Sequence, residues 1–153
     1  MLGGGLAISK RLKWPDDFFV LTYGLYYNNY FLKDYELVPN FSDGNSNDLH
    51  FKFVLASSSI DQPLYPRSGS NISFTFQVTP PYSAFSGMTN QQYADESAQQ
   101  KYKWIEYHKY KFNADWYQRV TGNLILRLSA KYGFLGYFNS GIGYSPFERF
   151  QLG

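Results

Sequence analysis

The chain contains no cysteine, and this absence excludes several kinds of chemistry. Without cysteine there is no disulfide framework, no thiolate metal site and no cysteine nucleophile. Charged residues are also scarce, at 17% of the 153 residues, against roughly 25% in a typical soluble domain. The net charge of +2 is too small, and the lysines and arginines are too scattered, to indicate nucleic-acid binding.

Long apolar runs are absent as well. No window of about 18 consecutive apolar residues occurs, so the sequence predicts no transmembrane helix. The first ten residues, MLGGGLAISK, lack a long apolar stretch and a small-residue cleavage site, so they do not form a signal peptide. There is no Gly-x-Ser-x-Gly elbow and no phosphate loop after the glycines at 3–5. We therefore expect neither an enzyme nor a cofactor.

Aromatic residues, by contrast, are abundant, at 21% of the chain, with 15 Tyr, 14 Phe and 3 Trp. The tyrosine ring is apolar and its hydroxyl is polar, which suits a boundary between an oily layer and water. Several aromatic residues fall near the ends of the segments described next, as the interfacial girdles of membrane barrels do. They are Trp14, Tyr27, Tyr30, Trp104, Trp116, Tyr117 and Tyr137.

Turn-forming clusters divide the chain into segments in which apolar and polar residues alternate. We expect six strands, at residues 3–10, 18–30, 49–59, 72–79, 104–118 and 124–134. Short turns are expected at 13–17, 61–70 and 121–123, and long polar loops at 33–48 and 81–101. The glutamine-rich part of the second loop is compatible with a short helix, and the tail from residue 139 to 153 is loop-like.

The pattern predicts an all-β, antiparallel fold with one oily and one polar face. Strands of about ten residues exceed the usual soluble length of about five to six and match a tilted strand that crosses a bilayer. Short turns alternate with long loops, as in outer-membrane barrels. We therefore expect a transmembrane β-barrel segment whose polar face lines the interior. The interior-facing charged candidates, which either line a pore or form ion pairs, are Lys52, Lys109, Lys111, Asp115, Arg127 and Lys131.

Six strands are too few for a closed barrel, because about eight is the practical minimum. An open edge in lipid leaves backbone groups unpaired, at a cost of several kcal/mol each. We therefore expect residues 1–153 to be a partial outer-membrane β-barrel domain, an internal fragment without periplasmic repeat domains. The remaining strands are expected from its own polypeptide rather than from partners.

Two local sequences add a resemblance to a known family. The turn Tyr65-Pro66-Arg67-Ser68-Gly69-Ser70 resembles an aromatic-Pro-x-x-Gly-Ser turn, and the tail from Pro146 through Phe147 and Phe150 to Gly153 resembles the segment that enters a sixth outer loop. Both belong to the BamA family, which forms the insertase barrel of the β-barrel assembly machinery. The resemblance implies that the six segments correspond to strands six to eleven of a sixteen-stranded barrel. Pro66 and Gly69 would shape a periplasmic turn, and Phe147 and Phe150 would begin the loop that folds into the lumen.

The resemblance implies an assembly factor in the outer membrane of a Gram-negative bacterium. Its partners would be outer-membrane lipid, client β-barrel proteins and accessory lipoproteins. The family's loop-six Arg-Gly motif, seam strands and periplasmic domains have no counterpart in these residues, so no insertase residue carries over. Two other functions stay open: a porin or transporter barrel, and a soluble β-sandwich that binds carbohydrate or peptide with its aromatic residues.

Two weaker patterns in the sequence bear on metal binding. His50 and His108 have no cluster of further ligands, so we expect solvated histidines at loop ends and no metal site. Polar residues around Gly44 resemble a calcium loop but lack its terminal bidentate glutamate. We therefore expect an ordinary polar outer loop at Asp43, Asn45, Asn47 and Asp48.

Overall fold

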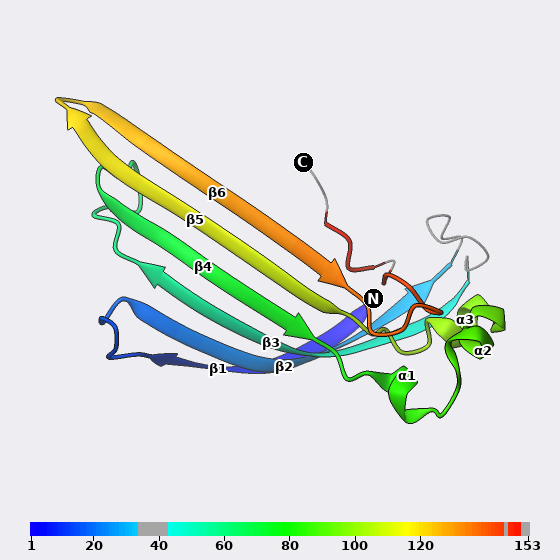
Figure 1. The fold of residues 1–153 in the computed structure, drawn as a ribbon. Helices are drawn as coiled ribbons and strands as arrows, with labels where there is room; N and C mark the ends of the chain where they lie inside the picture. Colours follow the sequence, from blue (N-terminus) through cyan, green and yellow to red (C-terminus); the bar gives the residue numbers. More distant parts are fainter. Residues whose placement is uncertain (34–42, 146, 151–153) are drawn as a thin grey trace.

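The computed structural model describes residues 1–33, 43–145 and 147–150, and they form one antiparallel sheet (Figure 1). The strands are β1 (Leu2–Arg11), β2 (Phe19–Leu32), β3 (Gly44–Ser58), β4 (Gly69–Val78), β5 (His108–Thr121) and β6 (Leu124–Gly136). Each strand pairs with the next along the chain. Within the described residues β1 does not pair with β6, so the sheet is open at both edges. The predicted all-β antiparallel fold of six strands is confirmed.

The connections leave the sheet at two opposite ends (Figure 1). The turns at residues 12–18, 59–68 and 122–123 lie at one end, which we call the turn end. At the other end, the loop end, β2 ends and β3 begins, and the connection at 79–107 lies there. The predicted arrangement of turns and loops is confirmed, but the contrast in length is weaker than predicted, because 33–43 is about as long as 59–68.

β3 accounts for that difference, since it begins at Gly44 and not at Leu49. The polar residues that follow Gly44 read as a loop in the sequence, but they continue the ladder with β2. The Tyr27 hydroxyl and the Asn29 amide each donate a hydrogen bond of 2.7 Å to Oδ1 of Asn47. Cross-strand hydrogen bonds of this kind stabilise a polar strand end.

β5 differs in the opposite direction, because it begins at His108 and not at Trp104. Trp104 and Ile105 turn toward β3 instead, while Tyr107 stays hydrogen-bonded to Thr79, directly after β4. Trp104 forms an isolated parallel bridge with Asn47, and the Ile105 amide donates to the Asn47 carbonyl at 2.8 Å. The predicted start of this strand at Trp104 is therefore wrong, and residues 104–107 belong to the connection at the loop end.

The connection from β4 to β5 folds into a small cap at the loop end (Figure 1). It contains α1 (Tyr82–Phe85), α2 (Asn90–Asp95) and α3 (Ala98–Lys101), the last two of which cover the glutamine-rich stretch. Gln99 fastens the cap to the sheet by donating to the Asn45 carbonyl at 3.1 Å. In the part of the chain that the structure describes, no helix has the length and apolar character needed to cross a membrane.

The register sorts the side chains into the two predicted faces. One row of facing residues crosses all six strands on the oily face: Ile8, Tyr23, Phe53, Phe76, Tyr110 and Phe134. The adjacent row lies on the polar face: Ser9, Thr22, Val54, Thr75, Lys111 and Gly133. Because side chains alternate along a strand, every strand contributes to both faces.

Candidate functional site: two faces of an open sheet

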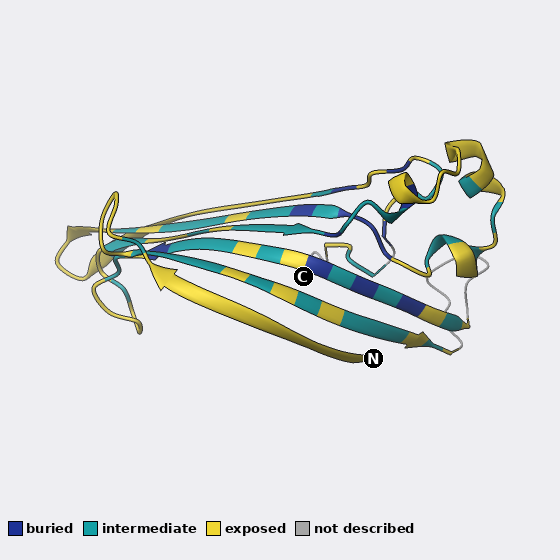
Figure 2. Ribbon diagram, turned by 90° about the horizontal axis from the view of Figure 1, so that it is seen from below, coloured by how far each residue is buried: buried dark blue, intermediate teal, exposed yellow. Residues whose placement is uncertain are grey.

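The oily face of the sheet is exposed. Leu6 is 84% exposed, Tyr132 64%, and even Phe53 on the inner strand β3 is 40% exposed. Figure 2 shows β1 exposed along its whole length and buried residues gathered mostly toward the loop end. Among the described residues, the buried apolar ones are Ile105 and Tyr107, and both lie in the cap. This distribution reverses that of a soluble domain, where large apolar residues occupy the core.

Aromatic rings pack side by side along this exposed face. The ring centroids of Phe53 and Phe76 are 6.2 Å apart, and those of Phe76 and Tyr110 are 4.8 Å apart. Tyr110 in turn lies 6.1 Å from Phe134. Cross-strand pairs of this kind stabilise the sheet from within. The face is therefore ordered without a second layer against it.

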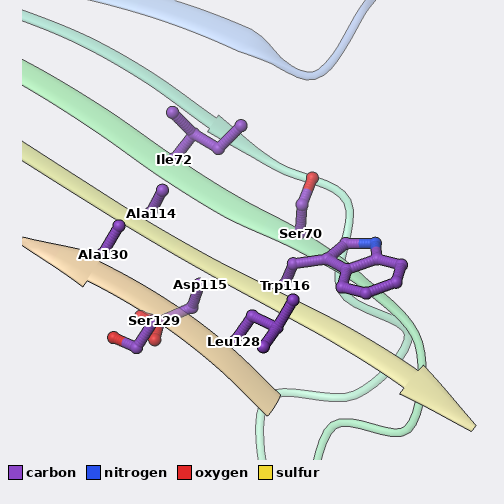
Figure 3. Close-up of a pocket in the computed structure, with 8 residues that line it drawn as sticks. All are labelled: Ser70, Ile72, Ala114, Asp115, Trp116, Leu128, Ser129 and Ala130. Carbon is purple, nitrogen blue, oxygen red and sulfur yellow. The ribbon is translucent and has the colours of Figure 1, made fainter. Parts of the chain in front are cut away.

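Two shallow hollows interrupt the oily face. The larger, of about 400 Å³, lies at the row Ile72, Ala114 and Ala130, where two small side chains leave space beside Trp116 and Leu128 (Figure 3). The smaller, of about 220 Å³, is lined by apolar and aromatic residues around Gly24 on β2. The wall of the smaller hollow is apolar throughout, whereas the wall of the larger one also includes Ser70, Asp115 and Ser129.

The structure places the interior-facing candidates together on the polar face. Lys52 and Lys109 both lie opposite Gln77, and Lys111 follows in the next row. Asp115, Arg127 and Lys131 lie on the same face, nearer the turn end. The sequence identified this set because a period of two assigns each residue to a face without further information.

Ion pairs take up part of this charge. Arg127 donates to Oδ1 of Asp115 from both Nε, at 3.0 Å, and Nη2, at 2.7 Å. Lys109 donates to Glu148, at 2.9 Å to Oε2 and 2.7 Å to the carbonyl oxygen, and its side chain is only 6% exposed. The sequence left two roles open for the interior-facing candidates, pore lining and ion pairing, and Lys109, Asp115 and Arg127 form ion pairs.

The tail of the chain folds back onto the polar face. The Phe147 ring stacks on Tyr30 with centroids 5.0 Å apart. The Phe150 ring lies against Gly133, where an added Cβ would come within 2.7 Å of it. Lys109 and Lys111 hold their ammonium groups 5.0 and 5.8 Å from the centre of the same ring. Two predicted family positions, Pro146 and Gly153, lie outside the described residues.

The turn that carries the other family-like positions is a compact structure at the turn end. Oδ1 of Asp61 accepts hydrogen bonds from the amides of Arg67, at 2.9 Å, and Ser68, at 3.2 Å. The Arg67 amide lowers the pKa of the Asp61 carboxyl below its usual value. Tyr65 before Pro66 adopts a positive φ of 57°, and Gly69 follows at 99°.

Ser70 closes this turn. Its amide donates to the Ser59 hydroxyl at 3.1 Å, and its carbonyl accepts from the Ser59 amide at 2.8 Å. Residues 59–70 therefore form one hydrogen-bonded turn between β3 and β4, and this turn contains Tyr65, Pro66, Gly69 and Ser70.

The histidines are not solvated as predicted. His50 is 6% exposed, its Nδ1 lies 2.8 Å from Oδ2 of Asp48, and its ring stacks on Tyr26 with centroids 5.4 Å apart. His108 packs among aromatic rings on the oily face, with Phe138 at 5.0 Å. Both predictions fail for the same reason. Each histidine lies in a strand and packs against other side chains, although the sequence placed it at the end of a loop.

The predicted polar loop at Asp43 to Asp48 is also corrected. Its residues from Gly44 onward belong to β3, and Asp48 turns toward His50 in a buried cluster closed by Tyr107. Burial raises the pKa of the Tyr107 phenol far above its usual value, and the nearby Asp48 carboxylate raises it further. No group of three or more metal-ligating side chains converges within the described ranges. The alternation of Ser46, Asp48 and His50 was the available signal for this cluster.

A search of family models and of curated proteins finds no match to the chain. The structure by itself defines an open antiparallel sheet, with apolar residues exposed on one face and polar residues covered in part on the other.

Proposed function

We propose that the chain is a stretch of a transmembrane outer-membrane β-barrel whose oily face contacts lipid. The exposure of that face carries the proposal. A soluble sheet buries its apolar side against a second layer, and no second layer lies on this side in the described part of the chain. Hydrocarbon chains of a bilayer would cover such a face, and the apolar hollow around Gly24 would accommodate them.

The dimensions of the strands support a membrane location. The 13 residues of β6 extend about 43 Å at about 3.3 Å per residue. At a tilt of about 45° they cover the roughly 30 Å of a hydrocarbon core. Exposed aromatic residues lie at both ends, with Trp14 and Tyr65 at the turn end and Trp104 and Tyr137 at the loop end. They would form the two interfacial girdles.

The open edges of β1 and β6 would need partners in lipid, where each unpaired backbone group costs several kcal/mol. We propose that further strands of the same polypeptide pair with these edges and close the barrel. The polar face would then line an enclosed interior.

Within this class, we propose that the barrel belongs to an assembly insertase of the BamA type, which folds and inserts client β-barrel proteins. Two features support this. The turn from Tyr65 to Ser70 joins neighbouring strands at the turn end, where a periplasmic turn would lie. The tail at 147–150 lies on the polar face, where a loop folded into the lumen would lie. Client barrels, accessory lipoproteins and lipid would be its partners.

One observation favours a porin or transporter instead. Lys52, Lys111 and Lys131 share the polar face without an ion pair among the described residues. Such a row would attract anions into an open channel. The tail weighs against this function, because it occupies the same face and is tied to Lys109.

The lipid contact can be tested with single cysteines, since the chain has none of its own. In the full-length protein in its native membrane, we compare Phe74→Cys on the oily face with Thr75→Cys beside it on the polar face. Phe74→Cys should resist a water-soluble maleimide and react with a lipid-soluble one, and Thr75→Cys should show the reverse preference. Equal reaction of Phe74→Cys and an exposed turn variant, Ser68→Cys, with the water-soluble reagent would refute the lipid contact.

The insertase function needs a separate test in cells. Depletion of the full-length protein should lower the folded amounts of several unrelated outer-membrane barrels together. Normal assembly of those barrels, accompanied by loss of solute uptake or of single-channel conductance, would instead establish the porin.

A further inference from the structure

A cavity of about 210 Å³ lies within the cap, away from both faces of the sheet. Its wall is formed by residues from α1, α2 and α3, by the segment at 103–106, and by Ile142 from the segment after β6. Six of them carry the argument that follows: Tyr82, Tyr93, Lys101, Lys103, Trp104 and Glu106.

Glu106 is the central residue of this cavity. It is 2% exposed, and its Oε2 accepts a hydrogen bond from the Ser83 amide at 3.0 Å. Its other carboxylate oxygen, Oε1, is buried and has no hydrogen-bond partner in the described part of the chain. The hydroxyl of Tyr82, on the same wall, is also buried without a partner. Since buried polar atoms are almost always paired, the cavity is suited to a ligand that donates hydrogen bonds.

Aromatic rings stand beside this carboxylate. The rings of Tyr82 and Trp104 lie 5.0 Å apart at an angle of 38°. Tyr93 is held in place by a hydrogen bond of 2.5 Å from its hydroxyl to Ser86. Aromatic faces together with a carboxylate attract ammonium groups through the negative face of each ring.

Two lysines also line the cavity, and their positive charge restricts the class of ligand that can bind there. Lys101 donates to the Ala94 carbonyl at 2.6 Å, so its ammonium is engaged within the cap. Lys103 is exposed and forms no ion pair among the described residues. A ligand that carried only a positive charge would be repelled by the ammonium groups of these two lysines. A ligand with an ammonium at one end and an anionic group at the other would satisfy Glu106 and Lys103 together.

We propose that this cavity binds a small zwitterion, whose ammonium lies against Glu106, Tyr82 and Trp104 and whose anionic group lies against Lys103. Phosphoethanolamine and β-alanine share this chemistry, since each has a primary ammonium that donates hydrogen bonds, and they differ in whether the anion is a phosphate or a carboxylate. The residues proposed to bind the ligand all belong to the cap, so the site does not depend on how the barrel closes or on what it inserts.

Calorimetry on the full-length protein in a maltoside detergent, which has no charged headgroup, tests the site. The probes are phosphoethanolamine and β-alanine, with ethanolamine and inorganic phosphate as the two halves of the first ligand. At least one zwitterion should bind, and at least tenfold more tightly than either half. Binding of ethanolamine as tight as that of the zwitterions would overturn the proposal, and so would binding of none of the probes.

Two substitutions locate the binding in this cavity. Glu106→Gln keeps an acceptor for the Ser83 amide and removes the charge, so it should weaken binding at least tenfold. Lys103→Ala, at an exposed position, should weaken binding of the zwitterion and leave binding of ethanolamine unchanged. Glu96→Gln, in the same cap but outside the cavity wall, should bind as the wild type does. Wild-type affinity in both Glu106→Gln and Lys103→Ala would refute the site. If Glu106→Gln does not fold, Trp104→Leu replaces it and must lose the same affinity.

Discussion

Gly69 occupies a position that other residues do not tolerate. Its φ is 99°, and an added Cβ would lie 2.2 Å from the Ser59 carbonyl oxygen. Backbone strain of this kind costs about 1–3 kcal/mol. We therefore expect Gly69→Ala to lower the unfolding free energy of the full-length protein in urea by about that amount. Gly4→Ala is the control, because nothing lies within 4 Å of a Cβ there. An equal loss in both variants would contradict the argument.

Asp61 makes the same turn sensitive to acid. The amides of Arg67 and Ser68 donate to its carboxylate, and they hold its pKa below the ordinary value of 3.8. A carboxyl with a lowered folded pKa contributes stability above its unfolded pKa and loses it as the pH falls through the folded pKa. The wild type should therefore lose stability between about pH 4 and pH 2 by more than Asp61→Asn does. Urea midpoints at pH 6 and pH 2 measure the difference, and identical losses in the two proteins would exclude this role of Asp61.

Lys109 and Glu148 join the tail to β5 through a pair whose side chains are 6% and 15% exposed. Removal of one partner of a buried pair leaves the other charge unpaired, at a cost of about 3–5 kcal/mol. In Lys109→Met we expect the amides at 147–150 to exchange hydrogen with solvent at least tenfold faster. Lys131→Met, on the same face without an ion pair, should leave their exchange unchanged. Unchanged exchange in Lys109→Met would mean that the ring contacts of Phe147 and Phe150 suffice.

At the scale of elements, the faces of the strands could be predicted, and their ends could not. The period of two alone placed Lys111 on the polar face and Phe112 on the oily face. The ends of β3 and β5 depend on contacts between distant segments. Asn47 stays in a strand because Tyr27 and Asn29 of β2 donate to it, and Trp104 leaves one because it bridges to Asn47.

The candidate sites divide in the same way. Charged residues of the polar face follow from alternation, and so were found. The Glu106 cavity was missed because it needs the folded cap, which brings α1 against the segment before β5. One signal was present in the sequence: Glu106 falls on the same parity as Tyr110 and Phe112, where an acidic residue on an oily face has no place.

The cap offers a prediction about its helix α2. Thr89 and Gln92 form a capping box, in which the Thr89 hydroxyl accepts from the Gln92 amide and the Gln92 side chain accepts from the Thr89 amide. Loss of the side-chain hydrogen bonds at a helix N-terminus lowers the stability of the helix by about 0.5–2 kcal/mol. Thr89→Ala should therefore speed hydrogen exchange of the amides at 90–95, while exposed Gln91→Ala should leave it nearly unchanged. Equal exchange rates in both variants would show that packing, and not the capping box, stabilises this helix.

For the whole molecule, the decisive property is that many large apolar side chains are exposed while several polar ones are buried. Apolar side chains cover one exposed face of all six strands, and the polar side chains of the other face form ion pairs with each other and with the tail. In water this arrangement would be a liability for aggregation. In a bilayer, the same face would satisfy the surrounding hydrocarbon, and the strands would keep their backbone groups paired.

A charge placed on each face separates these two environments. On a lipid-facing surface, a lysine at mid-membrane depth costs about 2–4 kcal/mol, whereas an exposed site in water accepts a lysine with little change. We expect Phe74→Lys to destabilise the full-length protein in lipid vesicles by about 2–4 kcal/mol more than Phe74→Ala, which removes the same ring without adding charge.

Thr75→Lys, the adjacent position on the polar face, provides the matched control for that charge. It should cost much less than Phe74→Lys, because its ammonium would join Lys111 on the face that is proposed to be wet. Urea unfolding in vesicles measures all three variants. If Phe74→Lys were no less stable than Phe74→Ala, the oily face would not lie in hydrocarbon, and the membrane location and the insertase function would both be wrong.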